Sequence, residues 1–213
     1  MKRCYKEDEF VARIQQSLGV KMPPYNCSIV STDEMTKEMM KAGWNKSQTR
    51  GVVGFHIDDK VFVKKGANWT TLHELIHRAG INADRINRRL AEGLTELVAS
   101  ELKTGNDEHK PTYPSERRWT EKLLKKLNMS ALELGRIVAQ ADNPPVAVAT
   151  LFKERGLTQN VRKTIDSLQP QKDVDISLNM VGRGSASFET LVSPIPLFLG
   201  MTAIAWTVAS LRR

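Results

Sequence analysis

Two histidines four residues apart, His73 and His77, enclose a glutamate in the order His-Glu-x-x-His. On a helix, side chains at this spacing lie one turn apart on the same face, so both imidazoles can reach one metal ion. Imidazole nitrogen is a ligand that zinc accepts readily. Glu74 projects in a different direction, where its carboxylate can contact a metal-bound water without taking a coordination position. The spacing therefore predicts a zinc ion held by His73 and His77, with Glu74 as the general base.

The residues around this motif favour a helix. Gly80 can end it, and an apolar stripe comes from Leu72, Leu75 and Ile76. Side-chain oxygens that can cap its first turn belong to Asn68, Thr70 and Thr71. The alternative interpretation makes both histidines ordinary, partly buried residues and places Glu74 on a solvated face.

A catalytic zinc ion needs a third protein ligand and one open position. Glu92 and Glu96 are one turn apart on a second predicted helix, whose apolar stripe is formed by Leu90, Leu94, Leu97, Val98 and Leu102. One carboxylate can bind the metal, and the other can accept a hydrogen bond from a ligand histidine. Gly93 lowers helix stability, which indicates a close approach of the two metal-binding helices there. Without the upstream motif, the two acids would be an ordinary surface pair.

With these residues in view, the sequence resembles the gluzincin metallopeptidases over residues 50–103. In that family a His-Glu-x-x-His helix precedes a second helix that carries a glutamate ligand. The resemblance implies that Glu92 is the third zinc ligand and that Glu96 supports a histidine. It also implies a zincin-like domain, in which a small sheet precedes the metal-binding helix. The short connection between His77 and Glu92 requires the two helices to be joined tightly.

The rest of the chain predicts an α+β fold that is mainly helical. A short strand at residues 27–30, a capping box from Ser31 to Glu34 and a hairpin of residues 51–57 and 60–64 precede the motif. Helices are expected at residues 7–18, 31–40, 84–103, 116–127, 130–141, 144–155 and 158–168. The edge strand of the hairpin can align an extended peptide substrate. We interpret His56, within this hairpin, as a structural residue.

A polar loop is expected at residues 106–115, and it carries two candidate oxyanion donors, Tyr113 and His109. Hydrolysis of a peptide bond passes through a tetrahedral intermediate whose oxygen needs such a donor. The alternative is that both are exposed loop residues without a catalytic role.

The composition excludes some classes of protein but does not identify one. The chain of 213 residues can bury a substantial core, and its net charge of +8 arises mainly in residues 110–172. Acids interspersed among the basic residues favour a solvated helical surface over a nucleic-acid interface. Cys4 and Cys27 can form one pair, but they have no zinc-ribbon spacing.

The C-terminal region divides into a polar linker at residues 169–189 and a hydrophobic segment at residues 190–213, after a domain of residues 1–168. Residues 190–211 carry no charge and approach the length of a membrane-spanning helix, although two prolines interrupt them. The alternatives are a membrane anchor and a helix buried in the fold or in an oligomer. No cleavable export signal is expected, because the N-terminus has no apolar core. The protein is thus expected at a membrane or in the cytoplasm.

The leading hypothesis is a zinc metallopeptidase that hydrolyses protein substrates or the peptide cross-links of a cell wall. A second hypothesis is a non-catalytic zincin-like protein with a structural or assembly role. A third treats the motif as accidental in a basic nucleic-acid binder. Measured zinc content separates the third from the others.

Overall fold

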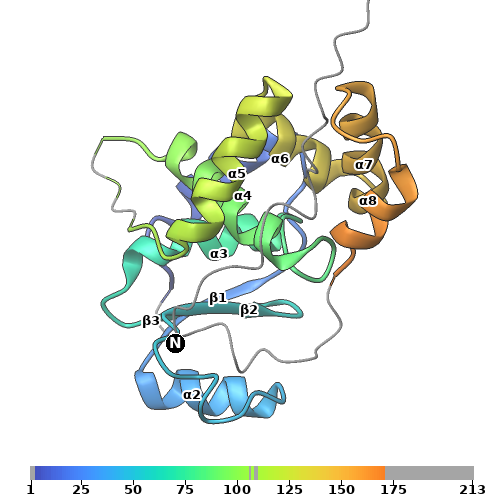
Figure 1. Ribbon diagram of the computed structural model, residues 1–213. Coiled ribbons are helices and arrows are strands. Elements are labelled where there is room, and N and C mark those ends of the chain that lie inside the picture. The colour runs from blue at the N-terminus through green and yellow to red at the C-terminus, as the bar shows by residue number, and fades with distance from the viewer. Residues whose placement is uncertain (1–2, 106, 108–109, 171–213) are drawn as a thin grey trace, which may run out of the picture.

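The computed structural model describes residues 3–105, 107 and 110–170 and shows a mixed α+β fold in which helices predominate (Figure 1). The elements are, in order, α1 (Glu7–Leu18), β1 (Asn26–Val30), α2 (Thr32–Lys41), β2 (Gly54–Ile57), β3 (Lys60–Lys64), a 3-10 turn (Asn68–Thr70), α3 (Thr71–Arg78), α4 (Arg88–Leu102), α5 (Pro114–Leu127), α6 (Ala131–Gln140), α7 (Pro144–Glu154) and α8 (Val161–Leu168).

The sheet has three strands with β3 at its centre. β1 pairs with β3 in parallel, and β2 pairs with β3 in antiparallel orientation. This confirms the predicted hairpin, although its first strand begins at Gly54 and not at residue 51. Phe55 lies opposite Phe62, and their rings stack with centroids 4.8 Å apart. This face of the sheet packs against α2, whereas the other face carries Val61 and Val63 into the main core beside α3. Figure 1 shows the sheet lying between α2 and the remaining helices.

Helix ends follow local capping chemistry, and several of them differ from the predictions by one to four residues. The predicted capping box is confirmed, because Ser31 and Glu34 exchange hydrogen bonds at the start of α2. α4 begins at residue 88 and not at 84, because the side chain of Asn87 caps it by accepting a hydrogen bond from the Arg89 N–H. α5 begins at Pro114, whose missing N–H is tolerated in a first turn.

The start of α3 also differs from the prediction. Thr70, its N-cap, makes no side-chain cap bond, and a 3-10 turn leads directly into the helix. At the other end Gly80 has φ of 114°, a conformation that costs glycine little, and its N–H bonds the carbonyl of His77. The motif therefore lies on a short helix, as expected, although its first turn is supported differently.

The main core is built around α4. All five residues of its predicted apolar stripe are buried: Leu90, Leu94, Leu97, Val98 and Leu102. α4 packs against α3, α5 and α6, and α1 packs against α3 and α6. A disulfide between Cys4 and Cys27 joins the segment before α1 to β1, which settles the pairing that the sequence left open. This core holds α3 and α4 in fixed positions relative to each other.

Gly93 confirms a close approach of helices, but its partner is α5 and not α3. A Cβ atom at this position would overlap the Thr120 hydroxyl and the backbone carbonyl oxygen of Glu116. Displacing the backbone of α5 would cost free energy, so the lack of a side chain at residue 93 allows α4 and α5 to pack closely.

We expect Gly93→Ala to lower the free energy of unfolding by about 1–3 kcal/mol, because overlap in a packed core outweighs the gain in helix propensity. Chemical denaturation measures the change. Gly105→Ala is the matched control, since nothing lies within 4 Å of a Cβ placed there. Equal or higher stability of Gly93→Ala would show that α4 and α5 can move apart.

Among the described residues, no helix is long and apolar enough to cross a membrane. The hydrophobic segment predicted at residues 190–213, and the linker from residue 171 onward, lie outside the described residues.

Candidate metal centre

Three side chains from α3 and α4 converge at one point. The two Nε2 atoms of His73 and His77 are 2.9 Å apart, and Oε2 of Glu92 lies 3.3 Å from the first and 3.2 Å from the second. All three residues are buried, with exposed fractions of 4, 5 and 8%. The pairing predicted between the two helices is therefore present, and Glu92 is the acid that reaches both histidines.

A polar group lies next to Nδ1 on the far side of each imidazole. Nδ1 of His77 lies 2.6 Å from the carbonyl oxygen of Ile81, to which it can only donate, so Nε2 carries the lone pair in the neutral ring. The Thr95 hydroxyl donates to the same carbonyl. Nδ1 of His73 faces Oε1 of Glu96 at 3.6 Å. Both imidazoles thus present Nε2 toward Glu92.

Glu96 lies beside Nδ1 of His73, on the side away from Glu92. Its Oε1 accepts a hydrogen bond of 2.8 Å from the Thr112 backbone N–H, and the residue is fully buried. A carboxylate held in this way can orient an imidazole and increase its basicity toward a metal. The geometry therefore gives Glu92 and Glu96 different surroundings, which the sequence alone could not distinguish.

The electrostatics of the centre favour a cation. Burial opposes a charge on His77, yet the nearby Glu92 carboxylate raises the pKa of His77 to about 9. Burial likewise opposes ionisation of Glu92, but the two histidines hold its pKa far below the usual range. The centre thus stabilises a positive charge between these groups. Two imidazoles and a carboxylate are a donor set that catalytic zinc accepts, so the residues fit the metal that the sequence predicts.

Glu74 lies beside this centre, outside the group of three candidate ligands. It is only 6% exposed, and Oε1 lies 3.4 Å from the Thr70 hydroxyl. The strand β2 passes directly over it: a Cβ atom at Gly54 would lie 2.7 Å from Oε1 and 2.8 Å from Cγ of Glu74. Gly54 therefore leaves the space that this carboxylate occupies.

Gly54→Ala should lower any turnover that depends on Glu74 by on the order of 10²-fold, because the new methyl group must displace the carboxylate. Zinc content should stay the same, since the substitution contacts none of the three ligands. Rate measurements together with metal analysis test both statements, with Gly105→Ala again as the control. An unchanged rate would mean that the position of Glu74 is unimportant.

His56 is a residue of the centre that the sequence interpretation did not include. Its ring stacks on His77 with centroids 5.4 Å apart, and its Nδ1 lies 3.9 Å from Oε2 of Glu74. Its side chain is 18% exposed, more than those of the ligands. Alternation along a strand provides the signal, because Gly54 and His56 share the face opposite to Phe55. Since Phe55 packs toward α2, the other two face α3.

Tyr113 reaches the centre from the position just before α5, with its ring centroid 5.7 Å from that of His73. Burial raises the pKa of its hydroxyl well above the usual range, and the charges of Glu92 and Glu74 raise it further. The hydroxyl therefore keeps its proton and remains a hydrogen-bond donor. Arg88 acts in the opposite direction on the pKa of this hydroxyl, and its Nε lies 3.8 Å from Oε1 of Glu92.

The second candidate donor, His109, lies outside the described residues. Arg88, with its side chain 35% exposed, and His56 are the more open members of the centre.

The two acids should respond differently to truncation. Glu92→Ala should remove most of the zinc affinity, because it deletes a ligand, whereas Glu96→Ala should lower the affinity by roughly 10- to 100-fold, because it deletes only a supporting group. Competition with a chromophoric zinc chelator measures both dissociation constants. A larger loss for Glu96→Ala would exchange the two roles.

Comparison with known proteins adds no assignment to this geometry. No family model matches the chain, and neither the curated proteins nor the solved structures give a match.

Proposed function

We propose that this protein is a zinc-dependent metallopeptidase of gluzincin type with a zincin-like domain. The observation that carries the proposal is the convergence of His73, His77 and Glu92, with Glu74 beside them and not among them. This arrangement separates the groups that would hold a metal from the group that would accept a proton. A structural zinc site normally uses four protein ligands, whereas this one offers three.

The residues of the chain would then have distinct roles in hydrolysis. Bound zinc would act as a Lewis acid that polarises the peptide carbonyl and makes water acidic enough to react at neutral pH. Glu74 accepts the proton of the attacking water and returns it to the leaving amine. The protonated hydroxyl of Tyr113 would donate a hydrogen bond to the oxygen on which negative charge develops.

The hairpin suggests how a peptide would be bound. β2 is an edge strand of the sheet, and its residues Gly54 and His56 face the centre. Among the described residues the outer edge of β2 pairs with no other strand, so an extended peptide could pair there and bring its backbone close to the centre. This mode of binding uses main-chain hydrogen bonds and therefore suits a protein substrate or a cell-wall peptide.

Peptide cleavage tests the proposal directly. The full-length, zinc-loaded protein is incubated with a diverse peptide library, and mass spectrometry identifies new termini. We expect cleavage that a chelator abolishes and added zinc restores. Zinc binding without cleavage would overturn the peptidase assignment. The near-complete burial of the three ligands fits that second outcome, a non-catalytic domain whose metal is structural.

A further inference from the structure

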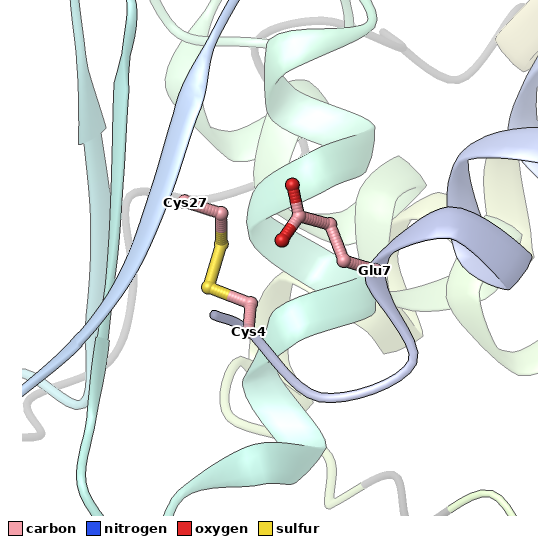
Figure 2. Close-up of side chains that lie close together, drawn as sticks. All are labelled: Cys4, Glu7 and Cys27. Carbon is pink, nitrogen blue, oxygen red and sulfur yellow. A yellow bond between two sulfur atoms is a disulfide. The ribbon is translucent and has the colours of Figure 1, made fainter. Parts of the chain in front are cut away.

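A second group of metal-ligand residues lies at the N-terminus of the fold, on elements other than α3 and α4. Cys4, Glu7 and Cys27 each offer one ligand atom, and these atoms all lie within 4.8 Å of one another (Figure 2). Cys4 precedes α1, Glu7 is in its first turn, and Cys27 lies on β1. The cysteines are 23 positions apart, so only the tertiary structure brings them together.

The two cysteines form a disulfide, and their Cα atoms are 5.6 Å apart. A tetrahedral zinc ion with Zn–S bonds of about 2.3 Å would hold two sulfurs about 3.8 Å apart. After the S–S bond is broken, side-chain rotation can provide that separation between neighbouring cysteines. The backbone that supports the disulfide therefore also suits a pair of thiolate ligands.

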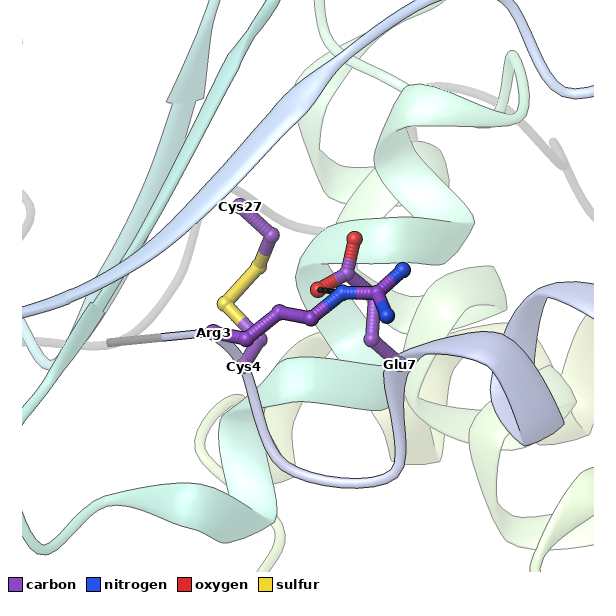
Figure 3. Close-up of a disulfide and its surroundings, with 4 residues drawn as sticks. All are labelled: Arg3, Cys4, Glu7 and Cys27. Carbon is purple, nitrogen blue, oxygen red and sulfur yellow. Dashed lines mark ion pairs between the residues drawn. A yellow bond between two sulfur atoms is a disulfide. The ribbon is translucent and has the colours of Figure 1, made fainter. Parts of the chain in front are cut away.

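Glu7 is the feature that a disulfide does not explain. It is 8% exposed, and its Oε2 is buried without a hydrogen-bond partner. Figure 2 shows the side chain of Glu7 extending from the start of α1 toward the two sulfurs. Arg3 pairs with Oε2 at 3.5 Å (Figure 3), but the Arg3 side chain is 69% exposed, and Tyr25 interacts with the same carboxylate. A buried carboxylate beside two sulfurs, paired at present with a largely exposed arginine, is a set of donors that could bind a metal ion.

We propose that reduction of the disulfide converts Cys4, Glu7 and Cys27 into a second zinc site. A dithiol reductant would be oxidised to its disulfide, while the Cys4–Cys27 bond takes up two electrons and two protons to become two thiols. Zinc then replaces the two thiol protons, which leave to solvent. Two thiolates and one carboxylate carry one negative charge more than Zn²⁺ neutralises. The positive charge of Arg3 lies beside them and offsets this excess.

This site would maintain one structural connection in two redox states. In an oxidising compartment the disulfide joins the segment before α1 to β1. In a reducing compartment, where disulfides do not persist, zinc would make the same connection. The proposal involves none of the residues around His73 and does not depend on peptidase activity.

The test compares metal binding by the full-length protein in its oxidised and reduced states. The protein is reduced with a phosphine, transferred to anaerobic buffer and titrated with Zn²⁺ or Co²⁺. We expect one more zinc per chain in the reduced state by native mass spectrometry. Co²⁺ should produce the near-ultraviolet charge-transfer absorption of a thiolate complex, only after reduction. Equal zinc content in both states, or no such absorption, would overturn the proposal.

Variants locate the site. Cys4→Ser with Cys27→Ser should lose the additional zinc, whereas His73→Ala with His77→Ala should keep it. Glu7→Gln should weaken the additional zinc by about tenfold or more, because a neutral amide is a poor replacement for a carboxylate ligand. Glu9→Gln, in the same turn but exposed, is the matched control. Equal affinities of these two variants would overturn the three-ligand site.

Reduction itself could unfold the chain, and circular dichroism monitors this. If the helical signal falls on reduction, addition of Zn²⁺ should restore it in the wild type and not in the double cysteine variant. Failure of zinc to restore the signal in the wild type would overturn the proposal.

Discussion

Replacing Glu74 by glutamine should lower peptide hydrolysis by roughly 10²- to 10⁴-fold and leave the zinc content and the fold unchanged. Glutamine has nearly the same shape as glutamate, so it can occupy the space beneath Gly54 and beside Thr70. It cannot accept the proton of the attacking water. The substitution thus removes the proposed general base and little else, and measured kcat/KM with metal analysis separates the two effects.

Glu38→Gln is a suitable control, because it makes the same chemical change on α2, which packs on the opposite face of the sheet. Its rate should equal that of the wild type. If Glu74→Gln hydrolyses peptides at the wild-type rate, Glu74 is not the base. If Glu74→Gln also loses zinc, the carboxylate of Glu74 takes part in metal binding, which the geometry does not suggest.

Replacing both His73 and His77 by alanine should remove the tightly bound zinc, expected at about one ion per chain. Glu92 alone would remain, and one carboxylate does not hold zinc tightly. Mass spectrometry of protein purified without added metal gives the stoichiometry. The measurement is made under oxidising conditions, so that the disulfide keeps Cys4 and Cys27 from binding metal.

His56→Asn provides the control for this experiment. His56 stacks on His77 but lies outside the group of three ligands, so its replacement should leave the zinc content unchanged. An unchanged zinc content in the double alanine variant would exclude the proposed centre. A loss of zinc in His56→Asn would instead add a histidine to the ligand set.

Local sequence determined much of what positions the centre. Helical spacing placed His73 and His77 on one face, and the stripe from Leu90 to Leu102 is buried as predicted. The capping box at Ser31 and the hairpin around Asp58 were also readable. These features depend on hydrogen bonds and periodicities within a few residues, so each short segment carries its own information.

Tertiary structure alone decided which distant groups meet. The distinction between Glu92 and Glu96 depends on how α4 is rotated against α3, because both acids lie on the same helix one turn apart. Gly93 indicated from the sequence that another helix approaches α4 closely, but only the packing identified that helix as α5. The periodicity of apolar side chains predicts which face of a helix is buried, but it does not predict which element covers that face.

The same reason explains the two features that the sequence did not reveal. His56 belongs to the centre because the hairpin folds back over α3. Cys4 meets Cys27 because α1 packs against α3 and α6, which brings the segment before α1 to β1. Each contact joins two segments that are far apart in the sequence, and their sequence separation does not determine how close they lie in space. Burial of a shared core brings them together, and that is a property of the whole packed chain and not of any segment within it.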